Sequence, residues 1–322
     1  MESVTKRKLN KDTIKSLVRF AFKDRFEVAQ MTELTDGYFN NSYLILLSGG
    51  KKVVLKISPK DDVKVLRYEK NLMKAEVSVL NMIAEKSDVP VPKVLFYDDG
   101  RILIDSDYFF MEYIEGIPLN KVKDNMTEEH LRNVGSDLGK YSRKIQNIKG
   151  DYFGFINIEN RRYDQWYECF KMMITDLMDD AESENVSLPV TKEQALCIVE
   201  KNQSNLGHVD SPSLLHKDLW DGNIFVDPVN YAIKGIIDCE RAIYGDPLLE
   251  AVCGFLDGNE FFMSQYFGKA NLDDAEQMRV KLYKFYLFLL MVIECPYRQY
   301  SDPNFEIWAR NELTKVTREL EY

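Results

Sequence analysis

The chain has 322 residues and a formal net charge of −10 at pH 7, with 45% hydrophobic and 29% charged residues. This composition is that of a folded globular protein and excludes intrinsic disorder, and the length favours two lobes around a cleft over one core. A negative charge without a basic stripe argues against a nucleic-acid partner. A cationic substrate would suit the charge, although solubility alone accounts for it.

The cysteines and the apolar runs indicate in which cellular compartment the protein is located. The five cysteines are widely spaced and include no C-x-x-C pair, which fits a reducing cytoplasm better than a zinc or redox site. The first twelve residues lack the apolar core of a secretory signal, and the longest apolar run, residues 285–293, is too short to cross a bilayer. The sequence therefore predicts a cytoplasmic protein without a membrane partner, and leaves the oligomeric state open.

The first part of the chain reads as a small sheet with helices. Apolar residues recur at helical intervals over residues 11–22 and again over residues 66–84, and the second helix should end before Pro90 and Pro92. Strands are predicted, in chain order, on both sides of a turn at Gly49 and Gly50, and then at residues 93–97 and 108–114.

Beyond Pro118 the pattern is mainly helical. Helices are predicted near residues 127–148, 163–178, 192–206 and 274–293. A β-rich island over residues 214–238 interrupts them, with short apolar strands at residues 224–226 and 233–237. The Glu-Gly-Ile-Pro sequence at residues 115–118 marks the expected boundary, which gives an N-terminal nucleotide-binding lobe (1–115) and a C-terminal catalytic and substrate-binding lobe (116–322).

The β-rich island contains the sharpest local signal, the sequence HKDLWDGN at residues 216–223. Phosphoryl transfer needs a carboxylate to accept or orient the proton of the attacking hydroxyl, and an oxygen ligand for magnesium on the nucleotide phosphates. Asp218 and Asn223, five positions apart at the mouth of a short hairpin, could fill these roles. Asp238, at the end of the next apolar strand, could supply a second oxygen ligand, and magnesium usually takes only one or two ligands from the protein.

These motifs resemble the aminoglycoside phosphotransferase and choline kinase group of small-molecule kinases, which shows H-x-D-x-x-x-x-N, then a strand ending in I-D, then G-D-P. The matching residues are His216, Asp218, Asn223, Ile237, Asp238, Gly245, Asp246 and Pro247. The resemblance covers nearly the whole chain and implies an α+β, two-lobed protein-kinase-like fold that uses ATP and magnesium. It further implies that Asp218 is the catalytic base, that Asn223 and Asp238 hold magnesium, and that Asp246 ties down the following helix.

The N-terminal lobe extends the resemblance to the nucleotide phosphates. The sequence VVLKI at residues 53–57 is similar to the kinase strand whose lysine contacts the α- and β-phosphates, so Lys56 is expected to be the phosphate lysine. A glutamate on the following helix normally pairs with this lysine. Glu76 lies at the family's position for it, and Glu69 is the alternative.

Two further segments are expected to contact the nucleotide. Residues 36–42 lie where the family has a small-residue loop over the triphosphate, so Asn41 and Ser42 are expected to contribute backbone N–H groups. Residues 109–114 resemble the hinge strand, where the carbonyl of Glu112 and the N–H of Ile114 would receive adenine.

The chain also departs from the family pattern. Lys217 stands where the family most often has glycine, a position at which protein kinases carry a basic residue. Gln146 stands where relatives often have a histidine, which concerns a packing contact rather than catalysis. Protein-kinase activity is disfavoured, because Asp238 is followed by Cys-Glu-Arg and the chain lacks D-F-G with a long activation segment and A-P-E.

The expected reaction is phosphorylation of a hydroxyl group on a small molecule. The resemblance favours an aminoglycoside-like antibiotic, hence a role in antibiotic resistance, over a metabolite such as a ketoamine, an amino alcohol or a sugar. The D-L-W-x-G-N sequence motif of the loop also occurs in ketoamine kinases. The acidic run at residues 176–184 is expected to be a solvated helix face; the rival interpretation is that these acids, or Asp257, Glu260 and Glu294, attract an amine-bearing substrate.

A different class of hypothesis is a catalytically silent, nucleotide-binding scaffold on the same fold. Such a protein would have no need for all four chemical positions that the chain retains: Lys56, Asp218, Asn223 and Asp238.

Overall fold

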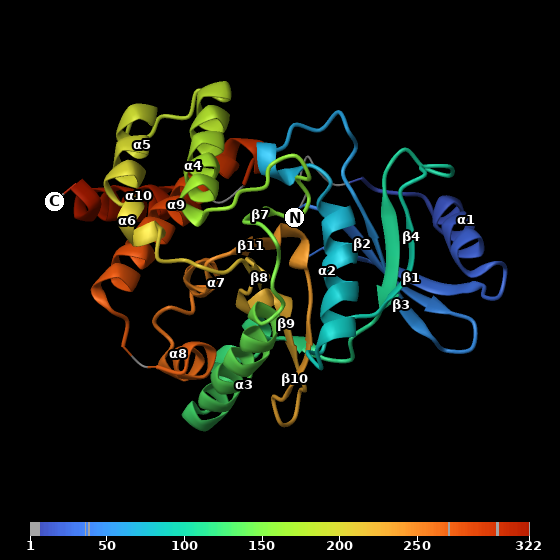
Figure 1. The fold of residues 1–322 in the computed structure, drawn as a ribbon. Helices are drawn as coiled ribbons and strands as arrows, with labels where there is room; N and C mark the ends of the chain where they lie inside the picture. The colour runs from blue at the N-terminus through green and yellow to red at the C-terminus, as the bar shows by residue number, and fades with distance from the viewer. Residues whose placement is uncertain (1–6, 36, 38, 270, 301–302, 322) are drawn as a thin grey trace.

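The computed structural model describes residues 7–35, 37, 39–269, 271–300 and 303–321. A sheet-containing lobe and a larger, mainly helical lobe lie side by side, as Figure 1 shows. This arrangement confirms the predicted α+β, two-lobed architecture.

The N-terminal lobe is built on a five-stranded antiparallel sheet in the order β1-β2-β3-β5-β4. Its strands are β1 (Val28–Leu34), β2 (Asn41–Leu47), β3 (Lys52–Ile57), β4 (Val94–Asp98) and β5 (Tyr108–Glu112). Gly49 and Gly50 join β2 to β3, both with φ at 83°, a left-handed conformation that favours glycine. The predicted hairpin is therefore confirmed.

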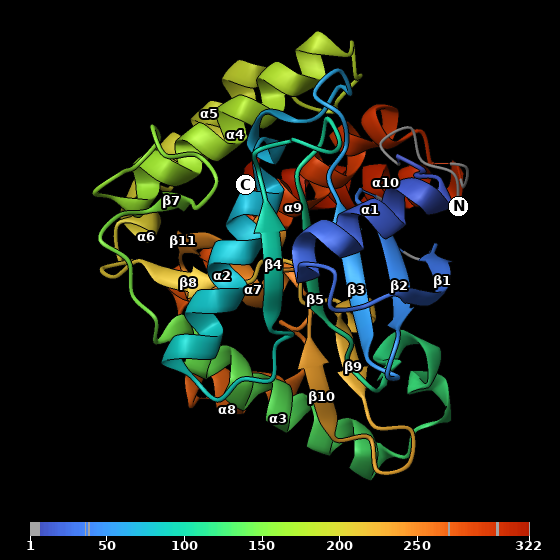
Figure 2. The same cartoon turned by 90° about the vertical axis from the view of Figure 1, so that its right-hand side faces the viewer.

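Helices cover both faces of this sheet. The helix α1 (Lys11–Phe22) has the predicted bounds and buries Leu17 against Ile45 and Leu55 on one face, the side from which Figure 2 views the sheet. The helix α2 (Leu72–Lys86) packs against the other face. Because the cluster around α2 also contains Ile224 and Ile236 of the second lobe, α2 connects the cores of the two lobes.

The helix predicted over residues 66–84 begins six residues later than expected. A 3₁₀ turn, Arg67–Glu69, precedes it, and Lys70 has an extended backbone. The side-chain amide of Asn157 donates hydrogen bonds to the carbonyl oxygens of Tyr68 (2.5 Å) and Lys70 (2.6 Å). In a continuous α-helix these carbonyls would accept from the following turn, so a long-range contact displaces the start of the helix.

The C-terminal lobe is mainly helical. Its helices are α3 (Glu128–Gln146), α4 (Trp166–Ser183), α5 (Lys192–Lys201), α6 (Gln203–Leu206), α7 (Pro247–Cys253), α8 (Glu260–Phe267), α9 (Asp274–Arg298) and α10 (Pro303–Glu321). The predicted helix over residues 192–206 is divided at Asn202, whose amide caps the carbonyl of Ile198 at 2.9 Å. The helix α7 is the one that the resemblance implied after Asp246. The helices α8 and α10 were not predicted individually, although α10 buries Leu313 and Val316 at helical spacing.

Two small sheets lie in this lobe. One has the order β10-β9-β6 and the other β7-β11-β8. Their strands are β6 (Ile117–Pro118), β7 (Gly154–Phe155), β8 (Ser213–Leu215), β9 (Ile224–Val226), β10 (Ile233–Ile236) and β11 (Ile243–Gly245). The predicted hairpin corresponds to β9 and β10, and β6 pairs with β9 immediately after the boundary that we propose at residue 115.

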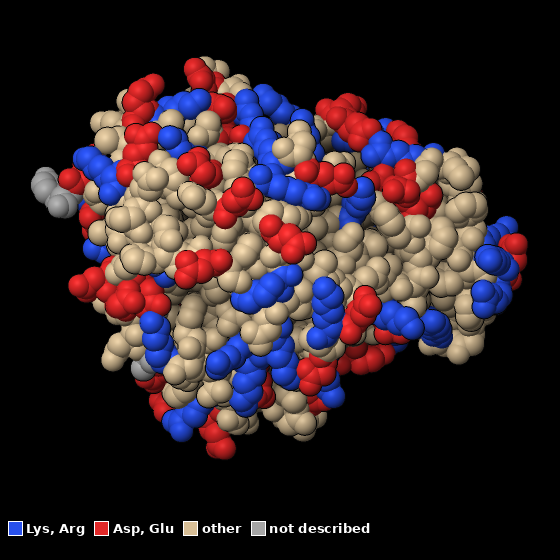
Figure 3. Space-filling view, viewed as in Figure 1, with Lys and Arg blue, Asp and Glu red and all other residues tan. Residues whose placement is uncertain are grey.

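The surface carries charge of both signs. Acidic and basic side chains are interspersed over the face shown in Figure 3. All five cysteines are free, and Cys197 is exposed whereas the other four are buried. Within the described part of the chain, no helix combines the length and apolarity needed to cross a membrane.

Candidate active site

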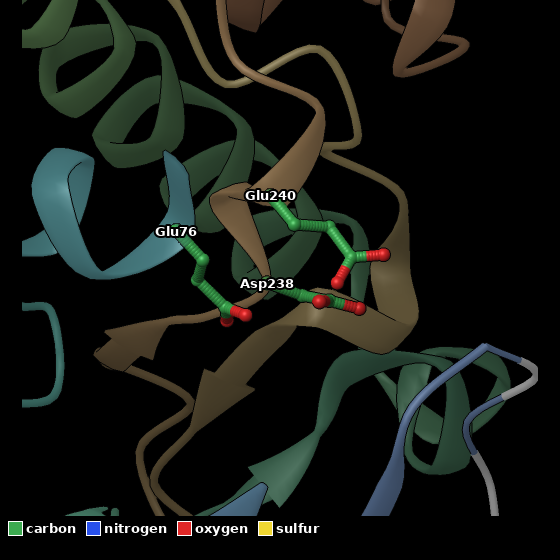
Figure 4. A group of neighbouring side chains, drawn as sticks. All are labelled: Glu76, Asp238 and Glu240. Atoms are coloured by element: carbon green, nitrogen blue, oxygen red, sulfur yellow. The ribbon is translucent and has the colours of Figure 1, made fainter. Parts of the chain in front are cut away.

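Lys56 of β3 meets three carboxylates between the two lobes. Its Nζ lies 2.7 Å from Oε2 of Glu76 on α2 and 3.3 Å from Oε2 of Glu240, and it also forms an ion pair with Asp238 just after β10. Oxygen atoms of the three acids lie within 4.8 Å of one another, and Figure 4 shows the side chains converging. One ammonium group thus faces three acids.

The crowding changes the protonation of this acidic cluster, which comprises Glu76, Asp238 and Glu240. Burial and the neighbouring carboxylates raise the pKa of Glu76 to about 8 and that of Glu240 to about 7. Burial opposes the charge on Lys56, but the three acids hold its pKa well above the usual value. Burial likewise opposes ionisation of Asp238, yet Lys56 lowers its pKa. The cluster has a surplus of oxygen ligands, and this donor set fits a hard divalent cation such as magnesium.

Asp238 is held at the cluster by its own backbone. It has a left-handed conformation, with φ at 68° and ψ at 45°, which aspartate tolerates better than most residues. Directly before it, the N–H of Ile237 donates to the carbonyl of Asn223 at 3.0 Å. The end of β10 is thereby tied to the loop that carries Asn223.

His216 braces the loop from below. Its Nε2 lies 2.8 Å from the carbonyl oxygen of Ile237, and its Nδ1 lies 3.3 Å from the backbone nitrogen of Asp218. Because a backbone N–H can only donate, Nδ1 must accept, so the proton lies on Nε2 and the ring is neutral. Burial lowers the pKa of His216 to about 4, which agrees with this state.

Glu250 of α7 holds the same loop from the other side. Its carboxylate accepts hydrogen bonds from the backbone N–H groups of His216 (2.5 Å) and Lys217 (2.9 Å). Asp246, which was expected to be structural, caps α7 by accepting from the N–H of Leu248 at 3.1 Å. Both acids therefore stabilise backbone rather than face a ligand.

Asp218 and Asn223 lie in contact, as their spacing suggested. The side-chain amide of Asn223 donates to the carbonyl oxygen of Asp218 (2.9 Å) and to its Oδ2 (3.0 Å). Burial raises the pKa of Asp218, and the charge of Arg241 partly offsets this effect. Asp218 is only partly covered, so its carboxylate can meet a ligand.

A cavity of about 1000 Å³ opens beside Asp218. It lies between α3, the loop at residues 217–221, residues 253–261 and α9, and its lining includes Trp220, Arg241, Phe255 and Glu294. This volume is large enough for a small-molecule ligand. A molecule in the cavity would reach the Asp218 carboxylate.

Asn41 and Ser42 differ from the expected loop placement, because both belong to strand β2. Ser42 pairs with Leu34 on one side and Lys56 on the other. The amide of Asn41 donates to the carbonyl oxygen of Arg7 at 2.7 Å. The alternating burial of β2 requires a continuous strand on both neighbours, which draws these residues out of the loop. Two other residues of the segment, Asp36 and Tyr38, lie outside the described residues.

The remaining predicted nucleotide contacts lie around the end of β5. Glu112 is the last residue of β5, and its N–H donates to the carbonyl of Lys93 at 3.0 Å. Ile114 packs against Gly235, where a Cβ atom would lie only 2.1 Å from Ile114 Cδ1. Glu69, the alternative partner of Lys56, instead pairs with Arg298.

Sequence reasoning did not select Glu240 or Asn40. The Asn40 amide donates to Oε2 of Glu240, so the segment before β2 contacts the acidic cluster. Glu240 could have been found from the sequence, because it is a carboxylate only two residues after Asp238. The acidic run on α4 lies apart from the cavity lining, and its members pair with basic residues, as in Asp180 with Arg67 and Asp179 with Lys192.

Family comparison agrees with this geometry. Residues 30–277 match the model of the phosphotransferase enzyme family. The chain belongs to this family. The match confirms the suspected resemblance and the predicted class of enzyme, a small-molecule kinase of the phosphotransferase family.

Solved structures with the same fold cover nearly the whole chain. A Thermobifida fusca protein assigned as a fructosamine-3-kinase has a TM-score of 0.69 at 20% identity, covering 97% of this chain and 99% of its own. A thermostable mutant of the aminoglycoside phosphotransferase APH(4)-Ia, in a complex with ADP and hygromycin B, has a TM-score of 0.65 at 17% identity, covering 95% and 98%. At these identities the likeness concerns the fold.

Curated relatives match over only part of their length. "Altered inheritance of mitochondria protein 9, mitochondrial" from Debaryomyces hansenii is 28% identical over 140 residues, 41% of this chain and 22% of the relative. "Probable acyl-CoA dehydrogenase IBR3" from Arabidopsis thaliana is 22% identical over 237 residues, 70% of this chain and 27% of the relative. The chain thus spans about a quarter or less of these proteins.

Proposed function

We propose that the chain transfers the γ-phosphoryl group of ATP to a hydroxyl group of a small molecule, with magnesium. One observation carries this proposal, a continuous set of contacts between the lobes. Asp218 binds Asn223, whose carbonyl binds Ile237; the next residue, Asp238, pairs with Lys56, which in turn pairs with Glu76. A catalytic carboxylate is thereby joined to a phosphate-binding lysine and two metal ligands.

In the proposed reaction, Asp218 orients the acceptor hydroxyl and accepts its proton as the new bond to the γ-phosphorus forms. The bond from that phosphorus to the β–γ bridging oxygen breaks, and ADP leaves with the electron pair. Lys56, held by Glu76, positions the phosphates. No covalent enzyme intermediate is needed.

We assign Asn223 and Asp238 as the protein's magnesium ligands, and Glu240 as a further candidate from the geometry of the acidic cluster. Magnesium would neutralise negative charge on the phosphates. Once the nucleotide is bound, its phosphates can take the place of Asp238 beside Lys56, which frees a carboxylate for the metal.

The nucleotide contacts are proposed at four further residues. Glu112 and Ile114 would receive adenine through the backbone, and Asn41 and Ser42 would flank the phosphates from the start of β2. Nucleotide complexes of similar structures support nucleotide binding in general: APH(4)-Ia with ADP, and aminoglycoside 2'-phosphotransferase-IIIa with GDP (TM-score 0.64). Competition between ATP and GTP would establish the preference.

For the acceptor, the first candidate is an aminoglycoside-like antibiotic, supported by the hygromycin B complex of APH(4)-Ia. A metabolite acceptor, such as a ketoamine, is the second candidate, supported by the T. fusca structure. A silent scaffold is disfavoured by the intact set of contacts between Asp218 and Lys56. The free cysteines support our proposal of a reducing, cytoplasmic location.

The test is magnesium-dependent ADP release against a panel of aminoglycosides, ketoamines, amino alcohols, sugars and hydroxy acids, with Asp218→Ala as the control. Acceptor-stimulated release that disappears in the variant and with a magnesium chelator is the expected result. Tight nucleotide binding without stimulation by any acceptor would contradict the proposal and favour the scaffold.

A further inference from the structure

Lys217 is a buried cation in the floor of the cavity. The residue is 3% exposed, and its Nζ lies 5.1 Å from the ring centroids of Tyr68, Phe155 and Tyr286. Within the described part of the chain its ammonium has no hydrogen bond or ion pair. The three rings stabilise the positive charge through cation–π contacts but do not provide an anionic partner.

The carboxylates closest to Lys217 along the chain and across the loop are engaged elsewhere. Asp218 accepts from Asn223, and both oxygens of Glu250 accept backbone N–H groups. A lysine ammonium offers three donors, and desolvation without an acceptor is unfavourable. Burial accordingly lowers the pKa of the Lys217 ammonium.

Arg241 adds a second cation to the same wall of the cavity. It lies 5.9 Å above the Tyr68 ring that also contacts Lys217. Its guanidinium is 3.8 Å from Glu294 and 3.9 Å from Glu69, both beyond hydrogen-bonding distance, and Glu69 already pairs with Arg298. Arg241 therefore retains hydrogen-bonding capacity beside Asp218.

Two tyrosines with buried hydroxyl groups adjoin Lys217. The buried hydroxyls of Tyr68 and Tyr286 have no hydrogen-bond partner among the described residues. Both rings contact Lys217. The part of the cavity lined by Asp218 thus presents two cations, Lys217 and Arg241, a pair that matches the oxygens of an anion.

The mouth of the cavity is aromatic. Trp220 and Phe255 are 40% and 49% exposed, and Phe261 and Phe305 also line the cavity. One acid of the lining, Asp221, is already paired with Lys123 at 2.6 Å. The lining also includes Glu260 and Glu294, and Glu294 lies 3.8 Å from the guanidinium of Arg241. A positively charged group placed next to Lys217 and Arg241 would meet like charge there.

Building on the phosphotransferase function above, we propose that the acceptor carries an acidic group, a carboxylate or a phosphate, which Lys217 and Arg241 bind beside Asp218. The aromatic mouth holds an apolar part of the same molecule. The acceptor class is then a hydroxy acid or a hydroxyalkyl phosphate, in place of the polycationic aminoglycoside that the similarity to APH(4)-Ia placed first.

Calorimetric binding to the full chain without nucleotide tests the acidic group directly. Two matched pairs separate its possible sources: 3-phenyllactate with 3-phenyllactamide for a carboxylate, and glycerol 3-phosphate with glycerol for a phosphate. At least one acid should bind about 10- to 100-fold more tightly than its neutral partner, as expected for charge-assisted hydrogen bonds. Equal binding within both pairs, or tighter binding of hygromycin B than of either acid, would overturn the proposal.

Lys217→Met tests the residue, because methionine keeps most of the length and apolar packing but not the charge. The preference for the acid should fall to about twofold or less, whereas Lys217→Arg should restore it. Lys315→Met, at an exposed position of α10 away from the cavity, is the matched control. An unchanged acid preference in Lys217→Met would contradict the assignment.

If Lys217→Met does not fold, as judged by circular dichroism, Arg241→Gln carries the same test. Because the binding measurement requires no turnover, it tests the anion subsite separately from the kinase function. An acid preference that depends on Lys217 without ADP release would refute the kinase function and leave the anion subsite intact. ADP release from neutral or polycationic acceptors alone would support the kinase function and refute the anion subsite.

Discussion

The two halves of the site differ in the sign of their surplus charge. Around Lys56, three carboxylates share one ammonium, whereas the Lys217 ammonium has three aromatic rings but no hydrogen bond or ion pair among the described residues, and Arg241 lies 3.8 Å from Glu294. The first half fits a metal cation, and for the second we propose an anion. In the proposed function, nucleotide chemistry and acceptor choice therefore depend on separate residues that meet at Asp218.

Replacing Asp218, where the halves meet, should have the largest effect. Asp218→Asn keeps the size of the side chain but cannot accept the hydroxyl proton, so kcat should fall about 10²- to 10⁴-fold with little change in ATP affinity. Asp221→Asn, a neighbouring cavity acid paired with Lys123, should retain most of the turnover. Similar losses in both variants would indicate that local charge, not a base, matters.

The second-largest effect is expected from removing Lys56, the single cation among the three carboxylates. Lys56→Met leaves the acidic cluster without its counter-charge and should reduce the free energy of unfolding by about 3 kcal/mol, besides weakening ATP binding. Lys52→Met, on the same strand with an exposed partner, Glu115, is the control and should leave stability unchanged in urea titrations. If the Lys56→Met protein were as stable as the wild type, protonation of the acids alone would be enough to relieve their mutual repulsion.

A smaller effect is expected for the acid beneath the catalytic loop. Glu250→Gln replaces one acceptor by an amide that faces a backbone N–H, so we expect a loss of about 1–3 kcal/mol in stability. Turnover should fall while the KM for ATP stays close to that of the wild type. A change confined to ATP binding would mean that Glu250 supports the nucleotide half instead.

The smallest effect concerns pH. The pKa of His216 is about 4 in the folded state and near 6.5 when unfolded, so the unfolded chain takes up the proton first and stability declines as the pH falls through this range. Between pH 7 and pH 5.5 this group should cost about 1 kcal/mol. His216→Gln should therefore lose that much less stability over the same interval in urea titrations; an identical loss in both proteins would exclude this source.

Much of the fold was predictable because its signals are local. The helix α1 buries three residues at helical spacing, and the turn at Gly49 and Gly50 needs positive φ angles, so both could be placed from short stretches. The start of α2 could not, because it depends on Asn157, more than eighty residues away. Likewise the burial of Asn41 in β2 depends on pairing across the sheet.

What the sequence by itself determined is the chemical core: the spacing of Asp218 and Asn223, the strand ending at Asp238, and the lysine strand with its family resemblance. Those residues lie in short segments whose geometry follows from local backbone structure. Only the tertiary structure brought Glu240 to Lys56, and enclosed Lys217 between rings from three distant segments. Burial and missing partners arise from contacts between segments far apart in the chain, and these decide which charges remain available to a ligand.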